Sequence, residues 1–597
     1  MSGINNFLDL PNEIIDSIAH FTFSGNTEGN NFCPDARCQQ VFANFASTQL
    51  HLLSEACEQE KSNYLFQWIN PNEIAKGMPQ PTDSDEEVVH PDSHAGKMKI
   101  FSTISDVLCS LGFDAAKSVH TCKEITAMIQ TAQDRDLEAI WPTIVQDMYL
   151  GHGAPAVNMS AAAIRTWMAQ NPQALQRITT LNLEQLGLHC VPREIGQLTA
   201  LQCLYLGNNK ISRLPPEIGN LVHLQNLYLN DNQLTAFPLE LEALADSLQI
   251  LNLNKNPIRE LSGLTKDFTN LTSLYLSGLK LKKLPQATIA HFNNLICLDL
   301  SKNQLKELPA NIGELVNLQN LNLSSNKLKS LPISIGNLRQ LQTLNLRQNQ
   351  LCEWPEDPEN LIIGNLTNLF ELDIAKNCFA YLPSEIGYLT NLQMFSLNEN
   401  LLFKLPAEIG NLHQLITLNL SGNLLDALPE EIGDLTNLEE LYLEDNQLKT
   451  LPQGIKDLQN LTHLYLEKNE LEELPKEIGN LKQLSRLHLD HNKLKTLENI
   501  GGLTGLTVLR VQDNKLTALP QEIETLTALA GLYLNDNQIT TLENINIENL
   551  TKLRHLHVVN NPLTGIPEKI QQMPLLEVKF DNNPIEIEIL QDQEQTT

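Results

Sequence analysis

The run Leu201-Gln-Cys-Leu-Tyr-Leu-Gly-Asn-Asn209 carries the pattern Leu-x-x-Leu-x-Leu-x-x-Asn, which returns at near-constant spacing to the end of the 597-residue chain. The commonest step between successive asparagines is 23 residues, with steps of 22 or 24 in places and one of 28 between Asn349 and Asn377. Leu186 and Leu279 take the asparagine position in two degenerate copies, which brings the number of units to 18. A fixed period of this length predicts a solenoid, because one unit buries its apolar side chains only by stacking on its neighbours.

The first half of each unit predicts a short strand. In Leu438-Glu-Glu-Leu-Tyr-Leu-Glu-Asp-Asn446, the side chains of Leu441 and Leu443 are two residues apart, as on one face of a strand. Tyr442 and its neighbours then face the other way. Burial of each leucine contributes roughly 2 kcal/mol.

The second half of each unit predicts a tight turn. Leu428-Pro-Glu-Glu-Ile-Gly-Asp-Leu435 places proline at the start, an acid next to it and glycine soon after. These residue types suit a very short helix or 3₁₀ turn on the outer side of the solenoid.

This pattern resembles the leucine-rich repeat family over about residues 176–589. The resemblance implies an α/β solenoid, a right-handed horseshoe with short parallel strands inside its curve, preceded by an all-α N-terminal region. It also implies that the repeat asparagine bonds the backbone of the adjacent turn. Asn446→Leu is then expected to cost about 1–3 kcal/mol.

Composition limits the classes of function. The net charge of −30, with a pI near 4.9, argues against binding to a nucleic-acid backbone and favours a basic protein surface as partner. No apolar run reaches the roughly 18 residues that span a bilayer, and the first thirty residues lack a secretory pattern. Cys203 and Cys297 stand at single repeat positions, without paired cysteine caps, which favours a reducing compartment. We therefore expect a cytoplasmic protein.

Residues before about 176 break the period and carry a different role. Composition divides the chain as follows: a helical domain at 1–76, an acidic proline-containing linker at 77–97, a helical region and N-terminal cap at 98–175, repeats at 176–590 and a tail at 591–597.

The first of these segments contains an amphipathic helix pattern. Ile14, Ile18 and Phe21 share one helix face, and Pro11 and Glu13 mark the start of the helix. The phrase resembles the opening helix of the F-box, the module that docks Skp-type adaptors of cullin–RING ubiquitin ligases. The matching residues are Leu10, Pro11, Glu13, Ile14, Ile18 and Phe21.

The rest of the segment departs from the F-box pattern. The second stretch of the F-box pattern is matched only loosely by residues 38–45, which follow an insertion rich in Gly and Asn. The alternative is an amphipathic helix in a small helical domain. The pairing of an F-box with leucine-rich repeats also occurs in effector-like proteins of intracellular bacteria, which would place the chain in the host cytoplasm.

The segment at 98–175 predicts several helices, including residues 105–111 and 136–145. Ser160 is the expected N-cap of a helix from Ala161 to Gln170 that stops at Asn171-Pro172. We expect Ile164 and Trp167 to face the first repeat, so that this helix forms the lid over the end of the solenoid core.

The sequence contains none of three common catalytic motifs, the phosphate-binding loop, the nucleophile elbow and the metalloprotease helix. Cys33, Cys38, His51 and Cys57 are a possible zinc set, although their spacing is not standard and buried structural cysteines are the simpler interpretation. No cysteine follows Cys378, which excludes the bacterial repeat ligases that use a C-terminal catalytic cysteine. We expect no enzyme, cofactor or metal.

The outward strand positions of six consecutive units predict a binding surface. Tyrosine and arginine dominate binding hot spots, and histidines would make binding sensitive to pH near 6–7. The predicted partner-binding residues are Tyr442, Tyr465, His488, Arg510, Tyr533 and His557, flanked by His463 and Arg486. The alternative is that strand positions tolerate aromatic residues for packing. Alanine at Tyr465, His488 and Arg510 together is expected to abolish binding and leave thermal unfolding nearly unchanged.

Two functions follow from these features. The first is a non-catalytic adaptor, whose concave face recruits a protein target while the F-box-like segment docks a ubiquitin-ligase adaptor. The second is a repeat scaffold without a ubiquitin link; an enzyme within 98–150 is a distant third. The long step near Trp354 adds five residues between Leu351 and Leu361, either as a contact loop or as a neutral insertion.

Overall fold

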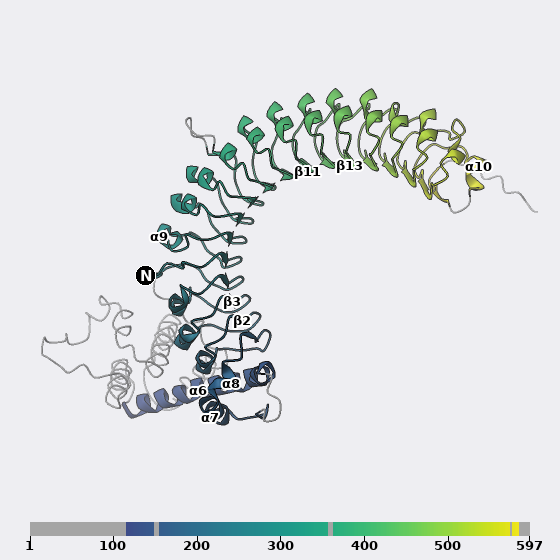
Figure 1. The fold of residues 1–597 in the computed structure, drawn as a ribbon. Coiled ribbons are helices and arrows are strands. Elements are labelled where there is room, and N and C mark those ends of the chain that lie inside the picture. Colours follow the sequence, from purple (N-terminus) through teal and green to yellow (C-terminus); the bar gives the residue numbers. More distant parts are fainter. Residues whose placement is uncertain (1–114, 149–154, 356–361, 574–575, 584–597) are drawn as a thin grey trace, which may run out of the picture. The chain divides into compact units, whose positions relative to one another are not determined.

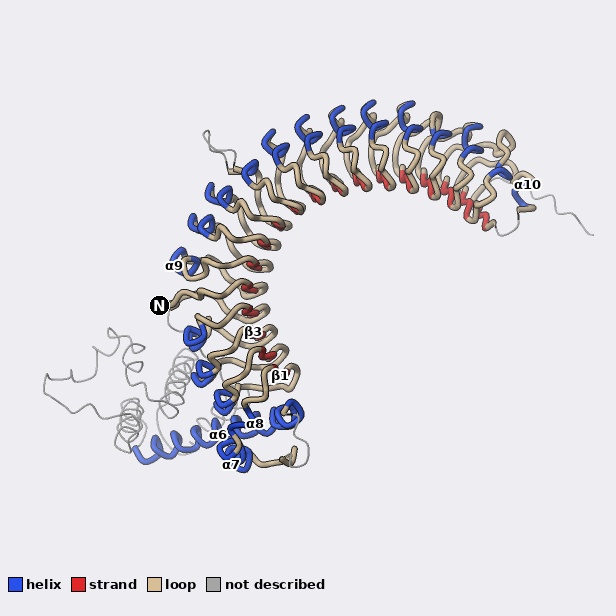
Figure 2. The backbone as a smooth tube through the Cα atoms, in the orientation of Figure 1, coloured by secondary structure: helices blue, strands red, loops and turns tan. Residues whose placement is uncertain are grey.

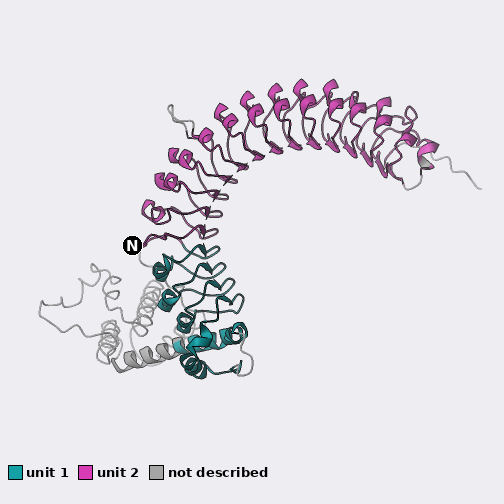
Figure 3. Ribbon diagram, in the orientation of Figure 1, with its two compact units in different colours: residues 1–258 teal, residues 259–597 magenta. Residues whose placement is uncertain are grey.

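The computed structural model describes residues 115–148, 155–355, 362–573 and 576–583 (Figure 1). The chain divides into two compact units, residues 1–258 and residues 259–597 (Figure 3).

The described residues of the first unit contain helices, strands and 3₁₀ turns in the order α6 (Ala115–Asp147), α7 (Ala161–Gln170), α8 (Pro172–Leu175), β1 (Thr180–Asn182), η1 (Arg193–Gln197), β2 (Cys203–Tyr205), η2 (Pro216–Asn220), β3 (Asn226–Tyr228), η3 (Leu239–Leu244) and β4 (Ile250–Asn252).

The described residues of the second unit continue the alternation of strand and turn. Its strands are β5 (Ser273–Tyr275), β6 (Cys297–Asp299), β7 (Asn320–Asn322), β8 (Thr343–Asn345), β9 (Glu371–Asp373), β10 (Met394–Ser396), β11 (Thr417–Asn419), β12 (Glu440–Tyr442), β13 (His463–Tyr465), β14 (Arg486–His488), β15 (Val508–Arg510), β16 (Gly531–Tyr533), β17 (His555–His557) and β18 (Glu577–Lys579).

Short helices and 3₁₀ turns separate these strands. They are α9 (Gln286–Ile289), η4 (Ala310–Glu314), η5 (Ile333–Asn337), η6 (Ile363–Asn365), η7 (Ser384–Tyr388), η8 (Ala407–Asn411), η9 (Glu430–Asp434), η10 (Gln453–Asp457), η11 (Lys476–Asn480), η12 (Ile500–Gly502), η13 (Gln521–Thr525), η14 (Ile547–Asn549) and α10 (Glu568–Gln571).

Each repeat contributes one strand to a parallel ladder. Inside each unit, equivalent residues pair from one repeat to the next, as Leu441 does with Leu464. In the second unit the strands follow the inner side of the curve and the turns follow the outer side (Figure 2). The described residues contain 18 strands, one for each repeat in the sequence. The predicted α/β solenoid is therefore confirmed.

The repeat leucines and asparagines form the core as expected. Leu441 and Leu443 are fully buried, whereas Tyr442 between them is half-buried on the opposite face. The Asn446 Nδ2 amide donates to the carbonyls of Leu420 (3.0 Å) and Leu443 (3.1 Å). Its Oδ1 accepts the backbone N–H of Leu425 at 3.1 Å. One side chain thus joins two neighbouring turns.

The outer turns also follow the prediction. Pro429 is the N-cap of η9, and its carbonyl accepts the backbone N–H of Ile432. Glycine occurs near the end of most of these turns, where adjacent turns approach closely. A Cβ atom on Gly410 would lie 2.6 Å from the carbonyl oxygen of Glu431 in the next repeat.

The N-terminal end of the repeat array is covered by two helices. The predicted helix from Ala161 to Gln170 is confirmed as α7, with Ser160 at the N-cap position. The Ser160 side chain makes no capping hydrogen bond; the Glu138 carboxylate of α6 accepts the N–H of Ala161 at 2.9 Å instead.

The prediction for the lid was wrong in part. Ile164 is fully buried, but Trp167 packs edge-on against Trp141 of α6, with ring centroids 5.4 Å apart. It is α6 that lies against β1, while α7 is joined to η1 by the ion pair of Arg165 with Glu194. The lid therefore consists of two layered helices.

Trp354 is a core residue. It is buried and stacks on Phe379 of the next repeat at 5.6 Å between ring centroids. Tryptophan thus takes the leucine position of the usual Leu-Pro pair. Residues 356–361, in the segment that contains the insertion, lie outside the described residues.

Candidate functional site

The six predicted partner-binding residues lie in one continuous column along β12–β17. Each is the third residue of its strand, and the parallel register places neighbouring members directly beside each other. The order along the column is Tyr442, Tyr465, His488, Arg510, Tyr533 and His557. We call this set the aromatic column. All six side chains are half-buried.

Ring contacts connect most neighbours in the aromatic column. The rings of Tyr442 and Tyr465 stack with centroids 4.8 Å apart and planes within 12°. His488 stands edge-on to Tyr465 at 4.9 Å, and His557 stands edge-on to Tyr533 at 4.8 Å. The guanidinium of Arg510 lies 5.9 Å from the centre of the Tyr533 ring. The geometry presents large, amphipathic side chains on a rigid ladder.

The same strand position has a different chemistry in the six preceding repeats. It carries short polar residues there, namely Asp299, Asn322, Asn345, Asp373, Ser396 and Asn419. In the Asn and Asp members, the side-chain Oδ1 accepts the backbone N–H two residues further on, at 2.9–3.1 Å. A short residue that bonds its own turn is sufficient for this fold. The change to large side chains at β12 is thus not required by the repeat.

The two flanking residues lie at the first position of their strands. His463 pairs in register with Arg486, and both neighbour the aromatic column. The His463 Nδ1 lies 2.8 Å from the hydroxyl of Thr462, and the Arg486 side chain is exposed.

Carboxylates border the aromatic column and pair with several of its members. The hydroxyl of Tyr442 donates to Glu440 at 2.8 Å, and burial together with this bond raises the pKa of the Tyr442 phenol. His488 Nδ1 lies 2.9 Å from Glu467 Oε1.

Arg510 Nε donates to the buried carboxylate of Asp490 at 2.8 Å. The other oxygen of Asp490 accepts the backbone N–H of Gln512 at 2.8 Å. This ion pair indicates that Arg510 also contributes to stability, whereas the sequence predicts that alanine at Tyr465, His488 and Arg510 leaves thermal unfolding nearly unchanged.

We predict that Arg510→Ala alone destabilises the protein by about 1 kcal/mol, because it leaves the buried Asp490 carboxylate without its cationic partner. The value is small because Arg510 itself is partly exposed to solvent. Urea unfolding measures the loss, and adding Asp490→Asn is expected to restore most of it. Equal stability of Arg510→Ala and the wild type would contradict this view of the pair.

Glu444 also borders the aromatic column, and its carboxyl lacks a cationic partner among the described residues. Its Oε2 atom is closed off from solvent and accepts no hydrogen bond from the residues that the structure describes. Burial, reinforced by the charge of Glu467, raises the pKa of Glu444 to about 7. At the far end of the column, burial and the nearby Lys579 lower the pKa of His557.

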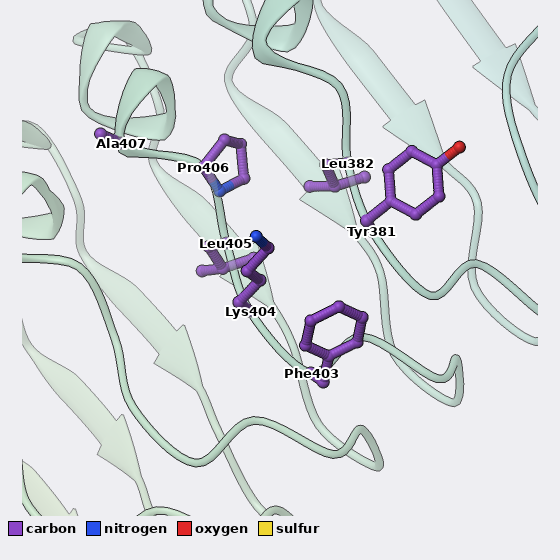
Figure 4. A pocket seen from close by; sticks show the side chains of 7 residues that line it. All are labelled: Tyr381, Leu382, Phe403, Lys404, Leu405, Pro406 and Ala407. Carbon is purple, nitrogen blue, oxygen red and sulfur yellow. The ribbon is translucent and has the colours of Figure 1, made fainter.

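A second surface feature, which the sequence reasoning missed, lies on the flank of β9–β11. Figure 4 shows a shallow hollow between two repeats, with the rings of Tyr381 and Phe403 at its rim. Leu401, Phe403 and Leu424 are each 43–50% exposed. The corresponding positions of the next repeats carry Gln447 and Lys449, so a comparison of repeats position by position would have revealed the patch.

A family model described as a leucine-rich repeat region matches residues 265–381 and 351–446. Two further models, a leucine rich repeat and a pair of leucine rich repeats, match residues 504–563 and residues 199–241 and 436–481 respectively. A leucine-rich repeat protein of Leptospira interrogans is 36% identical, over 70% of this chain and 93% of that one, with a TM-score of 0.52. The chain belongs to the leucine-rich repeat family. The comparison with curated proteins finds no match.

Plant receptors are also similar to this leucine-rich repeat protein. A plant peptide hormone receptor solved in complex with its peptide is 29% identical, over 68% of this chain and 67% of that one, with a TM-score of 0.53. The Arabidopsis receptor kinase HAESA, solved with a peptide hormone and a co-receptor, is 24% identical over 70% and 76%, with a TM-score of 0.54, and shows the fold alone.

Proteins of the leucine-rich repeat family are generally non-enzymatic scaffolds that bind protein partners. The part of the chain that the structure describes contains no helix long and apolar enough to cross a membrane. Within the same part, no cluster of His, Cys, Asp or Glu is arranged to hold a metal ion.

The other predicted site residues lie outside the described residues. These are the F-box-like set Leu10, Pro11, Glu13, Ile14, Ile18 and Phe21, and the zinc candidates Cys33, Cys38, His51 and Cys57.

Proposed function

We propose that this leucine-rich repeat protein is a non-catalytic scaffold that binds a protein segment along the aromatic column of β12–β17. The observation that carries the proposal is the change of residue type at one strand position. The six preceding repeats use short residues, mostly Asn and Asp bonded to their own backbone, whereas these six use Tyr, His and Arg.

The chemistry of the column supports binding. Half-buried tyrosine and arginine side chains on a rigid support lose little conformational entropy on contact and dominate known hot spots. The stacked rings of Tyr442 and Tyr465 present apolar area with polar groups at the edge. A similar plant receptor was solved with a peptide hormone bound, which shows that this type of solenoid can hold a peptide.

Selection from a displayed library of random peptides, with the purified full chain as target, tests the proposal. We expect a family of peptides whose binding slows backbone hydrogen exchange in the strands of residues 440–510 and not in those of residues 320–345. Failure to enrich any peptide, or protection confined to other strands, would remove the basis for the proposal.

The finer function that we propose is recruitment of the bound protein to a ubiquitin ligase. It rests on the F-box-like residues Leu10, Pro11 and Glu13 with their following helix pattern. The full chain is expected to bind a Skp-type adaptor, and Leu10→Ala with Pro11→Ala is expected to abolish that binding. No adaptor binding by the wild-type chain would leave an interaction scaffold without a ubiquitin link.

We further propose that the protein acts in a cytoplasm, which would be the host cytoplasm if the chain is a bacterial effector. Five cysteines among the described residues support this proposal because they are thiols rather than disulfides: Cys190, Cys203, Cys297, Cys352 and Cys378. Such thiols suit a reducing compartment.

A further inference from the structure

The carboxylates beside the aromatic column exceed the cations that balance them. Asp490 is paired with Arg510, and Glu467 is paired with His488, whose charge depends on pH. Glu440 accepts only the neutral hydroxyl of Tyr442, and Glu444 has no cation within bonding distance in the residues that the structure describes. The N-terminal half of the column is therefore short of positive charge.

The position of Glu444 shows that this acid is not required by the repeat. Two residues after the strand position of the aromatic column, five of the six preceding repeats carry small or neutral side chains, and β8 carries an arginine. These residues are Ser301, Ser324, Arg347, Ala375, Asn398 and Ser421. Glu444 and Glu467 are the first acids at this position along β6–β13. They appear in the same two repeats in which the stacked pair Tyr442 and Tyr465 begins.

We propose that the surface formed by Tyr442, Tyr465, Glu444 and Glu467 binds an arginine or lysine side chain of the partner segment. The aliphatic and planar parts of that side chain lie on the stacked tyrosines. Its cationic end lies at the accessible edge of the half-buried Glu444 and Glu467 side chains and supplies their counter-charge. The tyrosine rings and the carboxylates can bind the same side chain, because aromatic rings attract cations and carboxylates form ion pairs with cations. The inference rests on the proposed function, since it names the chemistry of the segment that the column binds.

In the free protein, burial makes ionisation of the Glu444 carboxyl unfavourable, and a bound cation would reduce this cost. Its pKa of about 7 lies above the ordinary value of 4.5, chiefly because the carboxyl is buried. The groups that act on it are Tyr442 of its own repeat, Glu467 and His488 of the next two repeats, and its own backbone N–H, which donates a hydrogen bond to the carboxyl. A raised folded-state pKa means that ionisation of Glu444 lowers stability as pH rises from about 4.5 through 7.

Binding of a cation has the opposite dependence on pH. The cation favours the ionised form of Glu444, so affinity is expected to rise by roughly tenfold between pH 6 and pH 8.

A double-mutant cycle tests the pairing directly. The probe is an arginine-containing peptide enriched by library selection on the wild-type chain, together with the same peptide in which citrulline replaces that arginine. We expect Glu444→Gln and the citrulline exchange each to weaken binding at least tenfold at pH 8. The two changes together are expected to weaken binding little more than either alone, because they remove the same contact.

Two controls separate this result from damage to the fold. Glu431→Gln removes the same charge from an exposed site on the outer turn that precedes β12 and is expected to leave affinity unchanged. Glu444→Gln itself is expected to raise the melting temperature at pH 8 and to leave it unchanged near pH 4, because it removes a buried ionised group.

The outcomes distinguish the inference from the proposed function. Selected peptides that depend on Tyr442 and Tyr465 but show no excess of arginine or lysine would overturn the inference and leave the proposed function in place. Additive effects of Glu444→Gln and citrulline would do the same. Absence of any peptide that binds the column would overturn both.

Discussion

Replacement of Asn446 by leucine is expected to destabilise the repeat array by about 3 kcal/mol, since it leaves three buried backbone groups without partners. These are the carbonyls of Leu420 and Leu443 and the N–H of Leu425. Leucine is close to asparagine in size, so lost hydrogen bonding rather than a cavity causes the effect. Because each repeat contacts only its neighbours, the loss is expected to unfold residues around β11–β12 before the rest of the unit.

Urea unfolding followed by circular dichroism measures this loss. The matched control is Asn437→Ala in the same repeat, where an exposed amide donates a single bond to the carbonyl of His413. The control is expected to cost less than 1 kcal/mol. Equal stabilities for the two variants would show that the asparagine ladder does not carry the repeat.

The second large effect is expected at Asp136, which fastens the N-terminal lid. Its Oδ2 accepts the backbone N–H groups of His189 and Cys190, both at 2.9 Å, and its side chain is buried. Asp136→Ala removes both of these charge-assisted hydrogen bonds, which is expected to cost about 3 kcal/mol locally. Detachment of α6 then exposes the first buried strand residue, Leu181.

Hydrogen exchange in the first repeats reports this opening. Amides of residues 180–206 are expected to exchange faster in Asp136→Ala than in Asp147→Ala, which removes an exposed carboxylate from the same helix. Unchanged exchange in both variants would indicate that α6 is held by apolar packing alone.

The solenoid could be predicted from the sequence because its causes are local. The spacing of Leu441, Leu443 and Asn446 sets strand direction, burial and ladder contacts within nine residues of sequence. The lid was harder to predict because its contacts join distant residues. Glu138 caps α7 from 23 residues away, and Trp167 packs on Trp141 rather than on the first repeat.

The binding column could be located from the sequence, but its energetics could not. Register alone brings Tyr442, Tyr465 and His488 together, and register follows from the repeat length. The burial of Asp490 beside Arg510 and the raised pKa of Glu444 depend on how neighbouring side chains exclude water. Residue type and spacing do not carry that information.

We propose that the side chains of the aromatic column are large because they bind a partner, and not because the repeat fold requires them. The test is the exchange of Tyr442→Asn with Tyr465→Asn, which installs the short residue found at the same position in β11. Asparagine there can bond its own turn as Asn419 does, at 3.1 Å, so the repeat keeps an equivalent local contact. Ser396→Ala at the same strand position of β10 is the control.

The test is calorimetric titration of a library-selected peptide into the wild type, the double asparagine variant and Ser396→Ala. We expect about hundredfold weaker binding for the double asparagine variant, unchanged binding for Ser396→Ala, and unfolding free energies within about 1 kcal/mol of wild type. Wild-type affinity in the double asparagine variant, or a loss of several kcal/mol of stability that accounts for weaker binding, would contradict the proposal.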